Sequence, residues 1–183
     1  MKFAISSFVA VLVLQVSAAA VVDHGLSHQL EARTCSNPAS AIPLYRAYNA
    51  NSFDHLYTTK VIELQDVVNA GTYTAEPVAG KIFATPGFDT VPFYRLYNPQ
   101  LYDHFYTTNA AERDFAVNSL QYVYEYVVGH VYPNADCNGI PLHRLYKLGP
   151  LGDHLYTTSA QEVTSAQTLG YSYEGVAAYI IPA

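Results

Sequence analysis

The chain has 183 residues, of which 50% are hydrophobic and 13% are charged, and its formal net charge is −6 at pH 7. Low charge with high apolar content is typical of a packed globule and excludes an intrinsically disordered chain. The acidic charge, without any basic cluster, excludes nucleic acid and anionic membrane surfaces as partners, because such a chain gains nothing from releasing phosphate counterions.

The first 20 residues have the pattern of a secretory signal peptide. Lys2 is followed by an apolar run over residues 3–16 and then by the small residues 17–20. This is the usual order of charged start, hydrophobic region and cleavage site. The run is shorter than the roughly 20 apolar residues that span a bilayer. We therefore expect a secreted, extracellular protein with a signal peptide at residues 1–20.

Residues 21–33 lie between this signal and the rest of the chain. They are polar and end in Leu30-Glu-Ala-Arg33. Two interpretations stay open, a pro-segment that is cut after Arg33 and a disordered tail. Residues 34–183 are then one domain of about 150 residues, a usual domain size.

One sequence unit is written three times in this domain. The motif Asp-His-x-Tyr-Thr-Thr begins at residues 54, 103 and 153, so the period is 49 and then 50 residues. A Tyr/His-Arg-x-Tyr segment precedes each motif, and the copies cover about residues 41–86, 90–133 and 139–183. A period of this length indicates a unit that must stack on its copies to bury its apolar face.

Each copy has the same succession of predicted elements. Alternation in the segment that begins Leu44-Tyr-Arg predicts a strand, turn-forming residues follow, and the Asp-His-x-Tyr-Thr-Thr motif predicts a second strand. Asn109 and Ser159 each stand three residues before a glutamate, which predicts a capping box whose glutamate bonds back to the cap. The predicted helices are 61–69, 110–119 and 160–168. The predicted third strands are 73–78, 122–127 and 171–176, each running on for a few residues, and Pro77 predicts an edge or bulge in the first of them.

These elements predict an α+β fold of one domain. In it, three pseudo-equivalent strand-strand-helix-strand repeats close into a pseudo-threefold ring. The alternative is a β-trefoil, which also has three units of about this length, although the helix signals weigh against it.

The two cysteines predict a disulfide. Cys35 precedes the first copy and Cys137 precedes the third, and two cysteines in a secreted chain are normally paired. Their spacing does not fit a C-x-x-C redox or zinc site. The bond would hold the start of the domain beside the third copy.

The full pattern resembles a known family. Tyr-Arg-x-Tyr-Asn, Asp-His-x-Tyr-Thr-Thr and a later Gly-Tyr-x-x-Glu-Gly-Val are similar to a tandem-repeat family of uncharacterised function in secreted fungal and bacterial proteins. The resemblance covers about residues 41–183. Some members lie beside cell-wall hydrolase domains, so the resemblance implies, by analogy, a wall- or glycan-binding role. It supplies no catalytic residues.

The recurrent polar residues are the candidates for a site. The arginines suit buried ion pairs with the aspartate of the hairpin or the glutamate of the third strand, because a guanidinium fork matches a carboxylate. The candidate structural ion-pair residues are Arg46, Arg95, Arg144, Glu76, Glu125 and Glu174. Histidine and tyrosine on one strand face could instead form an exposed pocket for a sugar ring. The candidate ligand-binding residues are Asp54, His55, Tyr57, Asp103, His104, Tyr106, Asp153, His154 and Tyr156.

Other interpretations of the histidines stay open. They could be hydrogen-bonded structural residues at the hairpin base. A further alternative brings the three imidazoles together to hold zinc. The main interpretation includes no metal and no cofactor.

Three equivalent units favour binding over catalysis, because an active site usually needs one asymmetric set of residues. We therefore expect a secreted, non-catalytic, lectin-like module that binds cell-wall or surface glycan. One alternative is a structural or interaction protein whose recurrent residues all serve the fold. Another is a glycan or wall hydrolase, although no nucleophile motif is present in the sequence.

Overall fold

The computed structural model describes residues 35–183, which belong to one compact unit, Arg33–Ala183. The predicted signal peptide and the predicted pro-segment or tail lie outside the described residues. Cys35 and Cys137 form a disulfide across a sequence separation of 102 residues, so that prediction is confirmed. In the described part of the chain, no helix is long and apolar enough to cross a membrane.

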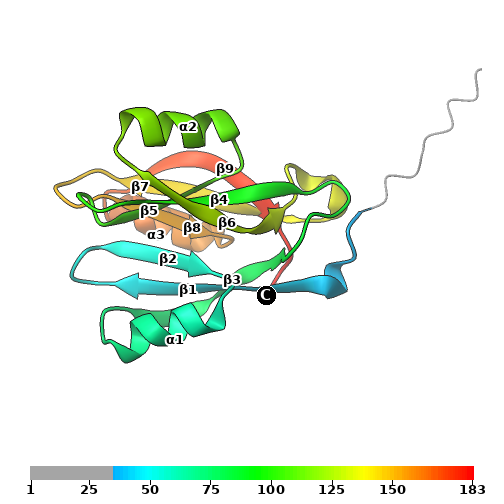
Figure 1. The fold of residues 1–183 in the computed structure, drawn as a ribbon, viewed down its shortest axis with the longest axis horizontal. Coiled ribbons are helices and arrows are strands. Elements are labelled where there is room, and N and C mark those ends of the chain that lie inside the picture. Colours follow the sequence, from blue (N-terminus) through cyan, green and yellow to red (C-terminus); the bar gives the residue numbers. More distant parts are fainter. Residues whose placement is uncertain (1–34) are drawn as a thin grey trace, which may run out of the picture. The chain divides into compact units, whose positions relative to one another are not determined.

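Antiparallel strands make up most of the regular structure (Figure 1). The strands are β1 (Ala41–Asn49), β2 (Asp54–Thr58), β3 (Thr74–Phe83), β4 (Val91–Asn98), β5 (Asp103–Thr107), β6 (Val123–Val131), β7 (Ile140–Lys147), β8 (Asp153–Thr157) and β9 (Ser172–Ile180). The α-helices are α1 (Val61–Asn69), α2 (Ala110–Ser119) and α3 (Ala160–Thr168), and two short 3-10 turns cover Pro38–Ser40 and Ala135–Cys137.

The strands form two sheets. One has six strands in the order β2-β1-β3-β6-β4-β5, and the other has three in the order β8-β7-β9. The two halves of the larger sheet meet where Phe83 of β3 pairs with His130 of β6. The smaller sheet is joined to the larger one by isolated bridges, Lys81 with Ile181 and Tyr132 with Tyr179.

Three tyrosines of the inner strands form the centre of the core. Tyr57, Tyr106 and Tyr156 are 0–1% exposed, and their rings meet edge to face with centroids 5.3–5.4 Å apart. Each hydroxyl donates to the backbone carbonyl of another member of the set and accepts from a backbone N–H. The polar ends of these large apolar rings are therefore satisfied without water.

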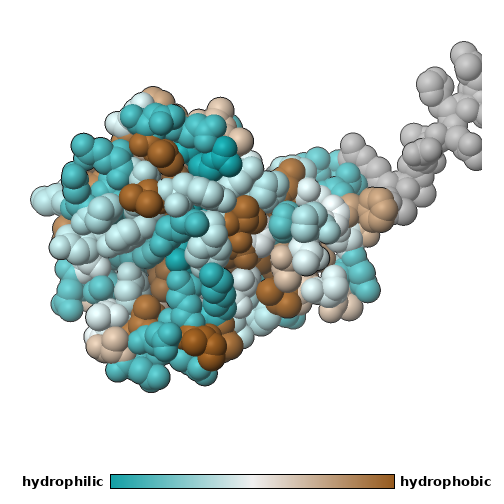
Figure 2. All heavy atoms as spheres, in the orientation of Figure 1, coloured by the Kyte–Doolittle hydropathy of each residue, from teal (hydrophilic) through white to brown (hydrophobic). Residues whose placement is uncertain are grey.

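The helices lie outside the strands, with α1 and α2 on opposite sides in Figure 1. All residues of α1 are at least partly exposed, and the residues that α2 and α3 bury are Ala116 and Ala166. Large apolar side chains at α2 stay exposed, Phe115 in the helix at 58% and Leu120 at its C-cap at 48%. On the face shown in Figure 2, apolar atoms form separate patches, one of them at the base of α2.

The predicted fold class is wrong. The protein is a β-rich antiparallel fold of a six-stranded and a three-stranded sheet, not an α+β domain of three equivalent repeats in one closed ring. The predicted helices do not determine the fold class, because three short outer helices contribute little to the core, which the strands form. The copies also differ in pairing, since β3 and β6 share a sheet and β9 does not. The β-trefoil alternative fails as well, because α-helices interrupt the strands of the described residues.

The capping prediction is half right. Asn109 accepts from the backbone N–H groups of residues 111 and 112, and Ser159 accepts from that of residue 162. The glutamate side chains do not complete a box. Instead, Thr107 and Thr157 accept from the cap N–H groups, which leaves Glu112 and Glu162 free to pair with arginines.

Candidate ligand-binding grooves

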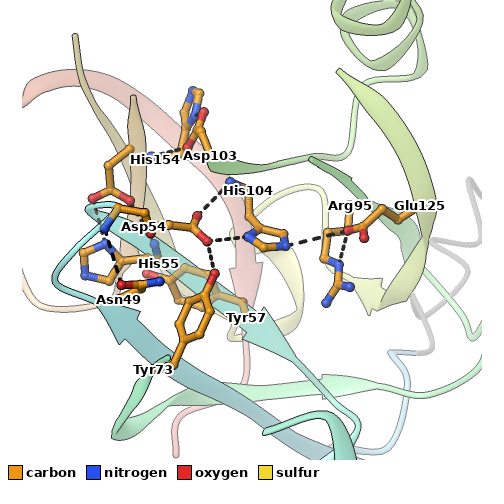
Figure 3. Close-up of polar contacts among 12 residues, drawn as sticks. Asn49, Asp54, His55, Tyr57, Tyr73, Arg95, Asp103, His104, Glu125 and His154 are labelled. Carbon is orange, nitrogen blue, oxygen red and sulfur yellow. Dashed lines mark hydrogen bonds and ion pairs between the residues drawn. The ribbon is translucent and has the colours of Figure 1, made fainter. Parts of the chain in front are cut away.

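The recurrent aspartates and histidines pair between copies, not within one copy. The Asp54 carboxylate accepts from the backbone N–H of His104 at 2.9 Å, and its other oxygen lies 2.7 Å from Nδ1 of the same residue (Figure 3). Asp103 contacts His154 in the same way, and Asp153 contacts His55. Because an ionised carboxylate only accepts, Nδ1 of each ring carries the proton.

A tyrosine completes each pair. Tyr73 donates its hydroxyl to Asp54 (Figure 3), and Tyr122 and Tyr171 donate to the other two aspartates. The three carboxylates offer oxygens within 4.8 Å of one another. All three aspartates are 0–1% exposed, and each already accepts a backbone N–H, an imidazole and a phenol. Their hydrogen-bonding capacity is therefore used within the protein.

The nine candidate ligand-binding residues are thus buried. The histidines are 7–8% exposed, and the aspartates and tyrosines lie deeper. Tyr57, Tyr106 and Tyr156 do not form an exposed stacking surface, because their rings form the core. Among the described residues, the groups that could hold an ion are the three aspartates and the set Cys35, Asp89 and Cys137, whose cysteines form the disulfide. The three histidines are not gathered into a zinc site.

The arginines form two ion pairs each. Arg46, Arg95 and Arg144 contact the glutamates of their own third strands, Glu76, Glu125 and Glu174, at 2.6–2.8 Å. Each also contacts a helix glutamate of another copy, so that Arg95 binds Glu63, Arg144 binds Glu112 and Arg46 binds Glu162. The sequence did not predict this second set of ion pairs, and the capping boxes predicted a different role for Glu112 and Glu162.

Pairing with arginine lowers the pKa values of the helix glutamates. Burial alone would raise the pKa of Glu63, but hydrogen bonds from Arg95 and its neighbours outweigh burial and lower that pKa to about 2. Burial alone would also raise the pKa values of Glu112 and Glu162. Hydrogen bonds from Arg144 and Arg46 outweigh burial and lower both pKa values. These ion pairs therefore persist into acidic solution.

Among the hollows where these ion pairs reach the surface, two grooves contain the same kinds of side chain. The first, here called the α2 groove, has a volume of about 420 Å³ and lies between α2 and the β7–β9 sheet. It is lined by Leu101, Phe105, Glu112, Phe115, Ala116, Leu120, Tyr122, Arg144, Tyr146, His154 and Glu174. The second, the α3 groove, has about 290 Å³ and lies between α3 and β1–β3. It is lined by Arg46, Tyr48, His55, Glu76, Leu155, Glu162, Ser165, Ala166, Leu169 and Tyr171.

The two grooves share one arrangement of side chains. Tyr146 lies against His154 with ring centroids 4.4 Å apart, and Tyr48 lies against His55 at 4.5 Å. Nε2 of each histidine faces the third-strand glutamate at 3.7 Å. Each groove therefore combines a half-buried aromatic ring with an imidazole, a guanidinium and carboxylates. Such a set can stack on a ring and exchange hydrogen bonds with hydroxyl groups.

The groove tyrosines were absent from the sequence-based candidates. The signal that could have identified Tyr48 and Tyr146 is their recurrence. These two and Tyr97, which lines neither groove, each stand two residues after the recurrent arginine. Alternation places these tyrosines on the arginine side of the strand, where the grooves form.

No curated protein and no solved structure matches the chain. A family model described as a domain of unknown function, DUF5648, matches residues 43–181. That single match spans all three sequence copies and both grooves, so the chain belongs to the DUF5648 family.

Proposed function

We propose that the protein is a secreted, non-catalytic carbohydrate-binding module that recognises cell-wall or surface glycan through its two grooves. The observation that carries this proposal is the recurrence of one tyrosine, histidine, arginine and glutamate set in both grooves. It keeps His154 and His55, which line the grooves, and replaces the buried aspartates and tyrosines of the Asp-His-x-Tyr motif by residues of the groove surface. The buried residues then act by holding the groove residues in place.

The chemistry of the grooves suits a sugar. The apolar face of a pyranose packs on an aromatic ring, and its hydroxyls need both donors and acceptors. Tyr146 in one groove and Tyr48 in the other are the proposed stacking rings. Glu174 and Glu76 are 32% and 26% exposed, so their carboxylates are available as acceptors.

Two features support secretion. The N-terminal sequence pattern is that of a signal peptide. The disulfide between Cys35 and Cys137 is of the kind that persists in oxidising compartments. We include secretion in the proposal for these reasons.

Two grooves on one domain fit a polymeric ligand. Two weak sites that engage one chain, or neighbouring chains, can raise the overall affinity by ~100-fold or more when the geometry permits both contacts. A soluble monosaccharide is therefore expected to bind far more weakly than an insoluble polysaccharide.

The test is binding of the purified secreted protein to a broad panel of soluble and insoluble polysaccharides, with and without EDTA. We expect binding that survives EDTA and that falls in Tyr146→Ala and Tyr48→Ala. Tyr124→Ala is the matched control, because Tyr124 is 40% exposed and lines neither groove. Unchanged binding in both groove variants, with melting temperatures intact, would contradict the proposal.

The second candidate is a structural or interaction protein of the secreted space. The burial of the Asp-His-x-Tyr residues favours it, because the fold alone accounts for their recurrence. A folded protein that binds nothing in the panel would support this candidate.

A further inference from the structure

We infer that the α2 groove selects a sugar carrying an acetamido group, whereas the α3 groove accepts a plain hydroxylated sugar. This inference rests on the proposed function and names the substrate class of one of its two sites. It comes from the difference between two grooves that share the same polar residues.

The difference is an apolar wall. Phe115 of the α2 groove stands where the α3 groove has Ser165, 50 residues later in the chain, and Phe105 stands where it has Leu155. The α2 groove is also the larger one, at about 420 Å³ against about 290 Å³. It therefore has room for an additional substituent, and an apolar surface to receive it.

Phe115 is available to a ligand. It is 58% exposed on α2, and Leu120 beside it in the groove is 48% exposed. The α3 groove has a leucine at the same helix end, Leu169 at 66% exposure, so the phenyl ring is what distinguishes the α2 groove.

The polar residues of the α2 groove suit an amide. The Glu174 carboxylate is 32% exposed and can accept an amide N–H. With the N–H on Glu174, the acetamido methyl group is free to pack against Phe115. A hydroxyl in the same place would offer nothing to the phenyl ring.

The charges of the α2 groove do not by themselves exclude an ammonium group. Arg144 contacts Glu112 at 2.9 Å and Glu174 at 2.8 Å, so one guanidinium stands beside two carboxylates and leaves a net charge of −1. An ammonium group would be attracted by this charge, whereas an acetamido group gains from packing on Phe115. Comparing the two ligands therefore separates electrostatic attraction from apolar packing.

Three series of soluble β-1,4-linked glucose-type oligomers test the inference, because they differ only in the C2 group: hydroxyl, ammonium or acetamido. Titration calorimetry of the full secreted protein should give about tenfold tighter binding to the acetamido series, the usual effect of one well-packed methyl group. Phe115→Ser should reduce this preference to about twofold or less. Ser165→Phe should add acetamido preference to the α3 groove. Both positions are exposed, so these variants are expected to keep the wild-type melting temperature.

Each outcome decides the inference. Equal affinity for the three series, tightest binding of the ammonium series, or an unchanged preference in Phe115→Ser would overturn it and leave glycan binding standing. Failure of all three series and of the polysaccharide panel would remove the proposed function, and the inference with it. Loss of the acetamido preference with residual binding in Tyr146→Ala, together with loss of discrimination alone in Phe115→Ser, would support both.

Discussion

The centre of the molecule and its grooves differ in how closely the three sequence copies agree. At the centre, Tyr57, Tyr106 and Tyr156 make the same hydrogen bonds in turn. On the outer helices, one position is aspartate at 66, phenylalanine at 115 and serine at 165. A buried position must satisfy all of its neighbours at once, whereas an exposed position is free to change. Within this chain, sequence identity between copies thus marks the fold, and divergence marks the surfaces where ligand preference can vary.

The largest effect is expected from the buried arginines. Arg95 is 4% exposed, and Arg95→Ala leaves Glu63 and Glu125 without their partner. These glutamates are 27% and 28% exposed, so water offsets part of the loss, and we expect a destabilisation of about 2–4 kcal/mol by urea denaturation. The control is Arg113→Ala, whose partner Asp114 is 59% exposed, and a much smaller loss is expected because solvent screens this surface ion pair. Equal effects of the two changes would remove the contrast between centre and periphery.

A smaller effect is expected from one hydroxyl of the core. The Tyr106 hydroxyl donates to the carbonyl of Tyr57 and accepts from its N–H. Tyr106→Phe leaves both backbone groups buried and unpaired, at a cost of about 2 kcal/mol. Thermal or urea unfolding measures it, with the exposed Tyr124→Phe as the control. A Tyr106→Phe protein as stable as its control would mean that the core packs by shape alone.

Acid should destabilise the protein through the shared ion pairs. The pKa of Glu63 is lowered from its ordinary value of 4.5 to about 2, and those of Glu112 and Glu162 are lowered in the same direction. A depressed native pKa contributes stability that is complete above the unfolded value and is lost as pH falls toward the native value. We expect the free energy of unfolding to fall between pH 5 and pH 2, and to fall less steeply in Glu63→Gln. Parallel curves for the two proteins would contradict the role of this glutamate.

The smallest effect concerns a hairpin loop at the periphery. Tyr102 is 50% exposed and has a positive φ of 54°, which is unfavourable for a side chain with a Cβ. Tyr102→Gly relieves this strain, which stabilises the folded state, but it also raises the chain entropy of the unfolded state, which offsets part of the gain. We therefore expect a net stabilisation of about 0.5 kcal/mol. Differential scanning calorimetry should show a slightly raised melting temperature. A lowered one would indicate that the phenol ring makes contacts that outweigh its backbone strain.

Local features were predictable from the sequence. The three helices begin and end at the predicted residues. Asn109 and Ser159 cap α2 and α3, and α1 follows from the repeat although Lys60 gives it no side-chain cap. Pro77 predicted an irregularity, and the pairing of β1 with β3 shifts register between Leu44 and Arg46, opposite that proline. Cys35 and Cys137 left a single pairing within the chain.

Partners across the copies were not predictable. The repeat shows that each copy has an aspartate and a histidine. The period is the same whether an aspartate bonds the histidine of its own copy or that of another copy, as Asp54 does with His104. The division into two sheets depends on single contacts such as Phe83 with His130, which carry no sequence signal. The grooves were missed because they form where one copy's helix meets another copy's sheet.

The crossed pairing of aspartates and histidines has a consequence for how the molecule opens. Each carboxylate is satisfied by a backbone N–H of a different copy, so no third of the chain is complete without the others. Opening one hairpin leaves a buried carboxylate without its donors in a second copy, and leaves a backbone N–H and an imidazole N–H without their acceptor in the third. Partial unfolding is therefore costly, and the amide hydrogens of His55, His104 and His154 should exchange with solvent at one common rate, that of global unfolding.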